Sequence, residues 1–286
     1  VENEVGSTEF VGYLVDCAQA KILAAIEGEG YTDIVLDRTP FYAECGGQVG
    51  DSGYIVNENL KAEVLTTFKV NHLFVHRCQV VNGEVKVGDY AFAQIDTARR
   101  AQIRVHHTSA HLLQAALIKV LGDEVKQAGS QVEENRMRFD FTFSRAMTPQ
   151  EVKKTEDIMN KWIGEKLPVN TDVMGIEEAK LTGATALFGE KYEDVVRVVS
   201  IGGKAKCNCG SDCSCDHESG EEKEVISKEF CAGTHASNTA DLRLVKIVSE
   251  GAIAAGTRRI EAVVADAAID YLNAKSAEID KLASRF

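Results

Sequence analysis

The stretch TARRAQIRVHHTSAHLLQAALIKVLG (97–122) separates two different sequence patterns. Within it, apolar residues such as Ile103, Leu113 and Leu117 recur every three to four positions, which predicts a helix with one buried face. Gly122 then supplies a residue suited to end that helix. Short strand-like segments come before the stretch, and both strands and helices follow it. This order predicts an α+β protein with an N-terminal small β-barrel, a mixed α+β core and a C-terminal helix.

The segment before this helix, residues 1–95, is expected to form the barrel. It holds short stretches in which apolar and polar residues alternate, and Gly-rich turns such as CGGQVGDSG separate them. The clearest stretches are TDIVLD (32–37), KAEVLTTF (61–68) and YAFAQID (90–96). Regular short strands of this kind are typical of a small barrel. Helical spacing in this segment appears only in KILAAI (21–26).

Residues 96–265 are expected to form the mixed core. Thr148 is predicted to be an N-cap, with Pro149 as the first and Glu151 as the third residue of a helix that runs to about Lys166. The other predicted elements are strands at 127–134, 136–144, 168–176, 194–202, 241–250 and 257–264 and a short helix at 177–183.

The C-terminal segment, residues 266–286, has helical spacing throughout. Its apolar stripe consists of Ala268, Ile269, Leu272, Ile279 and Leu282. Such a stripe suits part of a longer helix or of a coiled coil.

Composition restricts the class of protein. The chain has 286 residues, 44% of them hydrophobic and 27% charged, as expected for a globular protein. The net charge of −12 argues against a protein that coats nucleic acid, but it is compatible with contact to a single RNA end. Neither a membrane-length apolar run nor a signal peptide is present, so a cytoplasmic location is expected. The first residue is Val1, which favours a domain taken from a longer protein.

Two histidines in the opening stretch suggest a metal site. His107 and His111 are four residues apart and therefore lie on the same side of a helix. His106 points about 100° away, so we expect it at the surface or behind the site. Packed or solvent-facing histidines are the alternative interpretation of the pair.

A second motif, CAGTH, supplies Cys231 and His235. One thiolate and two or three imidazoles form a ligand set that suits Zn²⁺, if the fold brings the two motifs together. Thr108 stands where an HExxH protease has its glutamate, which excludes that class. Four protein ligands are typical of a structural zinc site, whereas a catalytic zinc keeps one position open.

A polar, acidic insertion at 203–228 carries half of the eight cysteines. No secretory signal accompanies them, which favours thiols or metal ligands over disulfides. Either the insertion holds a second soft metal ion or it is a flexible excursion with reduced thiols. The candidate ligands of that second site are Cys207, Cys209, Cys213, Cys215 and His217.

Several longer motifs occur in a fixed order along the chain. They are TEFVGY (8–13), RTPFYAECGGQVGDSG (38–53), HTSAHLL (107–113), KQAGSQV (126–132), RFDF (138–141), ALFGEKY (186–192), CAGTH (231–235) and RRIEA (258–262). Together they resemble the editing region of alanyl-tRNA synthetases, which is related to the free-standing AlaX editing proteins and to the editing domain of threonyl-tRNA synthetases.

The resemblance implies an editing activity within an alanine-tRNA ligase. The activity would be hydrolysis of the ester in mischarged Ser-tRNA(Ala) and Gly-tRNA(Ala). The implied partners are the acceptor end of tRNA(Ala) carrying Ser or Gly and the remainder of the synthetase chain in cis, and the implied cofactor is Zn²⁺. Two alternatives are a free-standing trans-editing hydrolase and a structural zinc module that only docks tRNA.

By the same resemblance, Gln127 and Ser130 lie near the editing pocket, and the loop Gly46-Gly47-Gln48 faces it. The family often has Thr where this chain has Ala110, so a pocket hydroxyl is lost there. Cys45 replaces a small residue before the loop, and we expect it to be a buried, inert thiol rather than a reactive one.

The ester of an aminoacyl-tRNA is labile, so the site mainly has to position a water molecule and stabilise the developing oxyanion. A zinc ion would lower the pKa of that water or hold the substrate amino group. A GxSxG nucleophile motif is absent. Cationic side chains are needed for the tRNA end. The candidates are Arg99, Arg100, Arg104, Arg136, Arg138, Arg258 and Arg259.

Overall fold

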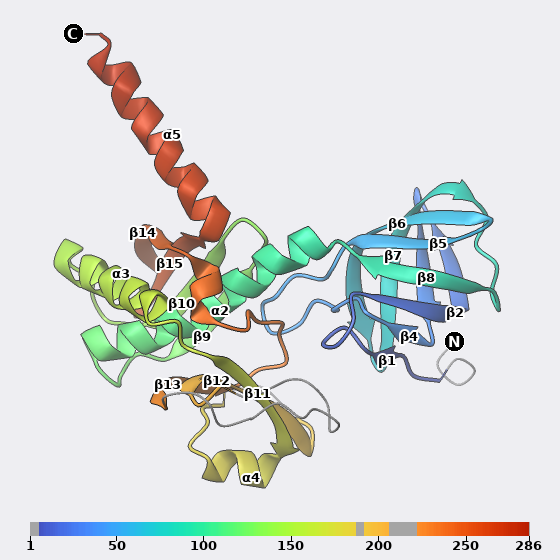
Figure 1. Ribbon diagram of the computed structural model, residues 1–286, viewed down its shortest axis with the longest axis horizontal. Coiled ribbons are helices and arrows are strands. Elements are labelled where there is room, and N and C mark those ends of the chain that lie inside the picture. The colour runs from blue at the N-terminus through green and yellow to red at the C-terminus, as the bar shows by residue number, and fades with distance from the viewer. Residues whose placement is uncertain (1–5, 187–191, 206–221, 286) are drawn as a thin grey trace. The chain divides into compact units, whose positions relative to one another are not determined.

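The computed structural model describes residues 6–186, 192–205 and 222–285 (Figure 1). The chain divides into two compact units, Val1–Gln102 and Ile103–Phe286. We call them the barrel unit and the α+β unit. The chain passes from the first to the second within helix α2 (Thr97–Leu121). This architecture confirms the predicted α+β class with its barrel and C-terminal helix.

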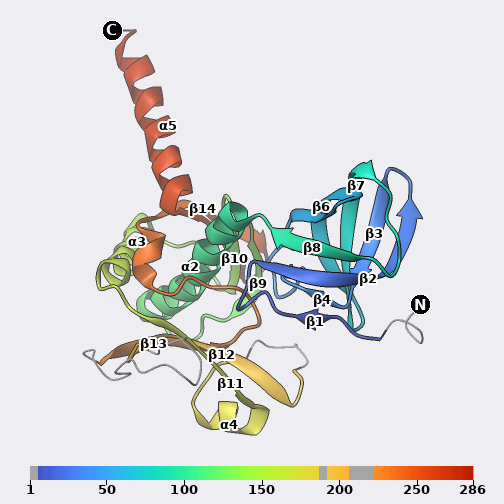
Figure 2. The same cartoon turned by 45° about the vertical axis from the view of Figure 1, so that its right-hand side comes forward.

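The barrel unit is a closed barrel of six antiparallel strands in the order β2-β3-β7-β6-β5-β8 (Figure 2). These strands are β2 (Cys17–Gly28), β3 (Tyr31–Leu36), β5 (Gly53–Asn57), β6 (Leu60–Val70), β7 (Leu73–Gly83) and β8 (Tyr90–Ile95). A short parallel pair, β1 (Glu9–Phe10) and β4 (Arg38–Thr39), lies outside the barrel. Alternate apolar side chains fill the barrel, as the sequence pattern predicts.

The segment KILAAI, with its helical spacing, is part of strand β2 and not a helix. Ala20 and Ile22 point into the barrel core, whereas Lys21 between them is exposed. A bulge after Ile22 shifts the register against β3, and this breaks the simple alternation that marks a strand in sequence. Pairing on both sides of β2 therefore overrides the local helical pattern.

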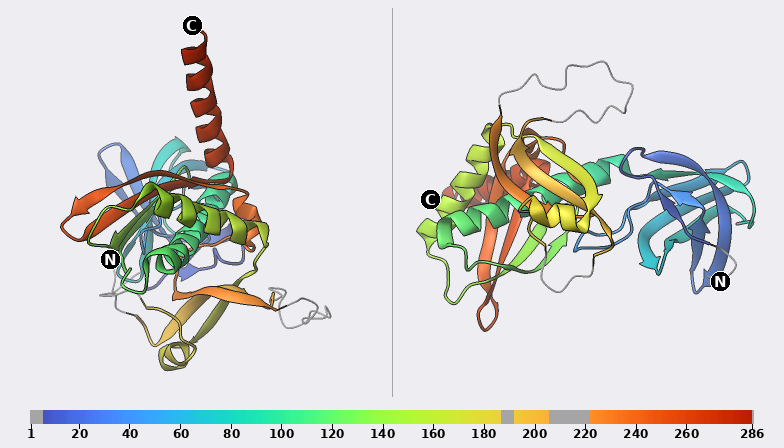
Figure 3. Two further views of the ribbon diagram at one scale, coloured as in Figure 1. Left: turned by 90° about the vertical axis from the view of Figure 1, so that its left-hand side faces the viewer. Right: turned by 90° about the horizontal axis from the view of Figure 1, so that it is seen from below.

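The α+β unit contains two separate sheets. The larger has the order β14-β15-β10-β9, and the smaller has the order β11-β12-β13. Their strands are β9 (Gln127–Val132), β10 (Met137–Thr142), β11 (Val169–Gly175), β12 (Val195–Gly203), β13 (Lys223–Phe230), β14 (Val245–Ala254) and β15 (Thr257–Val264). Figure 3 shows α2 and α3 (Pro149–Gly164) running along the larger sheet. The short helix α4 (Ile176–Leu181) packs on the smaller one.

Helix α2 buries the face that its sequence predicts. Ile103, Leu112, Leu113, Ala116 and Leu117 are all fully buried. Among the described residues, no helix is long and apolar enough to cross a membrane.

Helix α3 begins as its sequence predicts. Thr148 caps it, accepting a hydrogen bond from the Glu151 backbone N–H, while the Glu151 carboxylate accepts one from the Thr148 backbone N–H. This reciprocal capping satisfies two N–H groups that would otherwise lack helical partners. A 3₁₀ turn, Thr239–Leu242, packs against the same helix.

The end of the acidic insertion is more ordered than its composition suggests. Residues 223–228 belong to β13, which pairs antiparallel with β12. The last part of the insertion at 203–228 is therefore a strand. Backbone pairing with β12 keeps this charged sequence in the sheet. Residues 206–221 lie outside the described part of the chain.

The C-terminal helix, α5 (Ala265–Ala283), is only partly packed. Ala268 is fully buried, but Leu272, Ile279 and Leu282 are 40%, 65% and 56% exposed. Figure 1 shows the helix extending away from the sheet that its first turn contacts. The predicted apolar stripe is thus present, and most of it is uncovered in this chain.

Candidate metal centre

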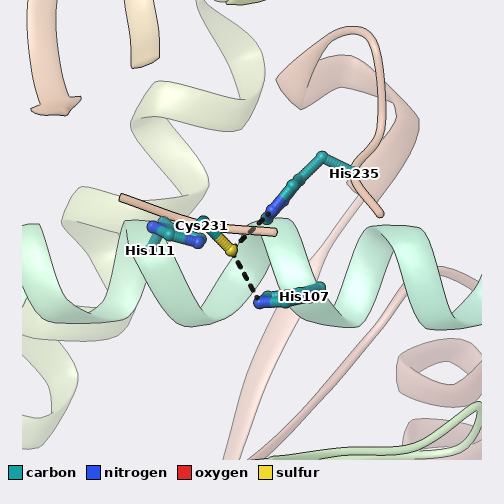
Figure 4. A group of neighbouring side chains, drawn as sticks. All are labelled: His107, His111, Cys231 and His235. Carbon is teal, nitrogen blue, oxygen red and sulfur yellow. Dashed lines mark hydrogen bonds between the residues drawn. The ribbon is translucent and has the colours of Figure 1, made fainter. Parts of the chain in front are cut away.

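The fold of the α+β unit unites the two histidine motifs. His107 and His111 project from adjacent turns of α2, while Cys231 and His235 lie on the segment that follows β13 (Figure 4). One nitrogen or sulfur atom from each of the four side chains lies within 4.8 Å of all the others. This group is able to hold a metal ion, as the sequence suggested.

Distances within the group suit a tetrahedral ion. The Cys231 Sγ atom is 3.5 Å from His107 Nε2 and 3.3 Å from His235 Nε2. A tetrahedral zinc ion, with bonds of about 2.3 Å to sulfur and about 2.0 Å to nitrogen, separates such ligands by about 3.5 Å. These two sulfur–nitrogen distances therefore fit Zn²⁺, and the four donor atoms together lie within 4.8 Å of one another.

The electrostatic environment of the group favours the protonation states in which cysteine and histidine bind a metal ion. Burial raises the pKa of the Cys231 thiol, but its electrostatic interactions with His107 and His235 lower that pKa well below its usual range. Burial, and after it the electrostatic interaction with His107, lower the pKa of His235 well below its ordinary value. A thiolate beside a neutral imidazole is the protonation state in which these two side chains bind metal.

Glu229 is a further member of the centre that the sequence analysis missed. Its Oε2 atom is 2.8 Å from His111 Nδ1, and its Oε1 atom accepts a hydrogen bond from Ser227 Oγ at 2.6 Å. Burial lowers the pKa of His111, but Glu229 and the Cys231 sulfur raise it to about 10. A carboxylate behind a ligating histidine orients the ring and increases its basicity. The only signal in the sequence is the position of Glu229 two residues before Cys231.

Arg197 on β12 holds the loop that carries Cys231. Its Nη1 donates hydrogen bonds to the backbone oxygens of Cys231, at 3.1 Å, and Gly233, at 2.6 Å. Its Nη2 donates to Thr171 Oγ1 at 3.1 Å. These bonds fix the CAGTH loop to the smaller sheet, a role that the sequence pattern did not indicate.

His106, which we expected at the surface or behind the site, is fully buried. Its Nε2 accepts a hydrogen bond from the Val264 backbone N–H at 3.3 Å, and its carbonyl oxygen accepts one from Ser109 Oγ. The expected surface position is wrong, because the side of α2 that carries His106 faces β15. Ala110 is also buried.

Two predicted pocket residues lie on β9. Gln127 Nε2 donates a hydrogen bond to Ser130 Oγ at 3.2 Å. Ser130 pairs with Phe139, whose side chain is in the core, so both lie on the inner face of the larger sheet. The part of Gln127 and Ser130 in a pocket remains a prediction.

The glycine loop belongs to the barrel unit. Gly46 and Gly47 adopt φ values of 57° and 81°, which favour glycine, and Cys45 and Gln48 close the turn by backbone hydrogen bonds. The Gln48 side chain is fully buried, and the position of this loop beside an editing pocket stays a prediction. Cys45 is exposed, contrary to the expected buried thiol, because the tight turn displays it.

Arg100 cannot contact tRNA as predicted, since it is 1% exposed. It forms a buried ion pair with Asp51 and donates hydrogen bonds to the backbone oxygens of Gly12 and Pro40 at 2.9 and 3.0 Å. Asp51 also accepts a hydrogen bond from the Tyr42 backbone N–H. Arg100 therefore holds together the two ends of the loop between β4 and β5, at Pro40 and Asp51.

The other candidate arginines are mostly engaged with protein acceptors. Arg258 pairs with Glu250, and Arg259 pairs with Asp140. Arg136 pairs with Glu133, and Arg99 donates to the Gly50 carbonyl. Arg104 and Arg138 are half-buried. A role for these six in binding tRNA stays a prediction. The second set of candidate ligands, Cys207, Cys209, Cys213, Cys215 and His217, lies outside the described residues.

Comparison with known proteins agrees with this description. Residues 4–99 match the family described as tRNA synthetases class II (A), and residues 196–261 match the second additional domain of threonyl and alanyl tRNA synthetases. The second match contains Cys231 and His235, whereas the two α2 histidines precede it. The chain therefore carries the additional domain that these two kinds of synthetase share.

More particularly, the chain corresponds to a region of alanine–tRNA ligases. It is 43% identical to that of a Synechococcus species over 288 aligned residues, covering 98% of the chain. It is 42% identical to that of Nostoc punctiforme and 40% identical to that of Acaryochloris marina, over 98% and 99% of the chain. The chain spans about 30% of the length of these relatives.

Proposed function

We propose that this chain is an editing module that hydrolyses the ester linking serine or glycine to tRNA(Ala). The observation that carries the proposal is the group of His107, His111, Cys231 and His235, of which the last two lie within the matched additional domain. The relatives are alanine–tRNA ligases about three times as long, so the module would act in cis with the rest of such a ligase.

Zinc is the metal that this donor set fits best. One thiolate and three imidazoles gathered within 4.8 Å of one another are donors typical of zinc sites. When bound, the ion would supply Lewis-acid chemistry, by polarising a carbonyl group, lowering the pKa of a water molecule or holding an amino group. The chain itself would supply the orientation of the ligands through Glu229 and Arg197.

Four protein ligands also support a second function, a structural zinc module that docks tRNA without hydrolysis. The two functions differ in one assay. Purified chain is mixed with Ser-tRNA(Ala), Gly-tRNA(Ala) or Ala-tRNA(Ala), and loss of the amino acid is followed over time. Editing predicts faster hydrolysis of the seryl and glycyl esters than of the alanyl ester, whereas a docking module leaves all three at the uncatalysed rate.

The same assay tests whether hydrolysis depends on the metal-binding group. Cys231→Ala removes one of the four donors and should abolish both the bound zinc and the hydrolysis. Lys154→Ala, at an exposed position on α3, is the control and should change neither. Wild-type hydrolysis by a zinc-free Cys231→Ala variant would contradict an essential metal.

A further inference from the structure

Thr108 lies between the two α2 histidines and contacts the other half of the centre. It is fully buried, and its Oγ1 atom is 3.2 Å from His235 Nδ1 and 3.1 Å from the Ala236 backbone nitrogen. The same atom is 3.0 Å from the Arg104 carbonyl oxygen, one turn earlier in the helix. One hydroxyl thus joins two motifs that are far apart in the sequence.

The hydrogen-bonding capacity of a hydroxyl determines the direction of each bond. Threonine has one donor and two acceptor sites. The Arg104 oxygen can only accept, so it takes the hydroxyl proton, and the Ala236 N–H can only donate, so it occupies one lone pair. The remaining lone pair faces His235 Nδ1, which must therefore carry the ring proton.

From this arrangement we infer that Thr108 is a positioning residue that fixes the tautomer of His235. With the proton on Nδ1, the other ring nitrogen, Nε2, presents its lone pair to the group, 3.3 Å from Cys231 Sγ. Without the hydroxyl, the ring is free to rotate or to place its proton on Nε2, which blocks coordination. Glu229 lies against Nδ1 of His111 in the same way, so each motif has one histidine whose Nδ1 is oriented by a neighbouring side chain.

This inference rests on the proposed metal site, and its test uses metal affinity rather than hydrolysis. Thr108→Val keeps the shape of the side chain but removes the hydroxyl, whereas Thr108→Ser restores the hydroxyl. Ser109→Ala is the matched control, because it removes a neighbouring buried hydroxyl of α2 that donates to the helix carbonyl of His106. Zinc affinity is measured by competition with a chromophoric chelator, and Co²⁺ spectra report the geometry.

Loss of an outer hydrogen-bond partner typically weakens metal binding about 10- to 100-fold, which is the loss expected for Thr108→Val. Thr108→Ser and Ser109→Ala should keep wild-type affinity and Co²⁺ spectra. Equal affinity of Thr108→Val and the wild type, or an equal loss in Ser109→Ala, would overturn the role of Thr108. A wild type that binds no zinc would instead overturn the metal site itself.

A second measurement needs no variant and decides the matter if Thr108→Val does not fold. Long-range ¹H–¹⁵N NMR spectra of the zinc-loaded wild type distinguish the two ring nitrogens of each histidine. The inference requires His235 to carry its proton on Nδ1. A proton on Nε2 of His235 would overturn it.

Discussion

Glu229 shows how a single side chain controls the chemistry of the centre. Its carboxylate forms an ion pair with the His111 ring, with Oε2 2.8 Å from Nδ1, and the other ring nitrogen lies in the group that contains the Cys231 sulfur. In the metal-free protein, burial lowers the pKa of His111, but Glu229 and Cys231 raise it to about 10. His111 is therefore protonated on both nitrogens at neutral pH, and a metal ion must displace one proton to bind.

Zinc binding should consequently release about one proton near pH 7. We expect His111 to supply it, because its pKa is raised to about 10, whereas the pKa of Cys231 is lowered well below its usual range. Since protons compete with the metal, affinity should fall as the pH is lowered from about 10. Glu229→Gln removes the charge that raises the His111 pKa, so it should release fewer protons and bind zinc about 10- to 100-fold more weakly.

Isothermal titration calorimetry in two buffers of different ionisation enthalpy measures the number of protons released. Glu224→Gln is the matched control, since Glu224 is an exposed residue of the same strand, and it should behave as the wild type. Equal proton release by Glu229→Gln and the wild type would show that Glu229 does not control His111.

The sequence predicted the donors of the centre but not the residues behind them. The spacing of two histidines four residues apart on a helix, and of the Cys231–His235 pair, can be recognised in the sequence. Glu229, Arg197 and Thr108 have no such spacing, because strand pairing and loop position bring them to the site. Arg100 was misassigned for the same reason, since a buried arginine and a surface arginine look alike in sequence.

Among the secondary-structure elements, those with local signals were predicted best. The N-cap pattern placed the start of α3, and apolar periodicity gave the buried face of α2. KILAAI was misleading because a bulge in β2 mimics helical spacing. The strand β13 was missed because most of it lies in the stretch taken as the acidic insertion, and pairing with β12 makes it a strand.

The capping of α3 gives a prediction at this scale. Thr148→Ala removes the side chain that accepts the Glu151 N–H, and the loss of such a cap costs about 1 kcal/mol of unfolding free energy. Trp162, the only tryptophan of the chain, lies buried on this helix, so its fluorescence in a urea titration reports on the right element.

Lys154→Ala is the control for this cap, because it changes an exposed position on the same helix. Its unfolding midpoint should stay close to that of the wild type. A midpoint for Thr148→Ala equal to that of the control would mean that the cap contributes nothing to the stability of α3.

At the scale of the whole molecule, each of the two units contains polar side chains that connect segments distant in sequence. In the α+β unit the metal-binding group connects α2 with the segment after β13. In the barrel unit the Arg100 guanidinium bonds to Asp51 and to the backbone oxygens of Gly12 and Pro40. The order of strand and helix patterns along the chain predicted the N-terminal barrel, the α+β part that follows and the C-terminal helix. These polar contacts join residues far apart in sequence, so they became visible only in the folded structure.

Arg100→Met should destabilise the barrel unit strongly. Removing one partner of a buried ion pair leaves the other charge uncompensated, which costs about 3–5 kcal/mol. Hydrogen exchange followed by mass spectrometry should show faster exchange in the loop at 38–53. Arg38→Met, which removes an exposed ion pair with Glu9, is the control and should leave exchange in residues 41–53 unchanged. Wild-type protection of the loop in Arg100→Met would contradict this role of Arg100.

The central claim is that the group of three histidines and one cysteine holds a metal ion on which ester hydrolysis depends. The most direct measurement is hydrolysis of Ser-tRNA(Ala) by one preparation before zinc removal, after removal and after stoichiometric zinc is restored. We predict that activity disappears with the metal and returns with it in the wild type, but does not return in Cys231→Ala. Full activity of the wild type with its zinc removed would contradict the claim.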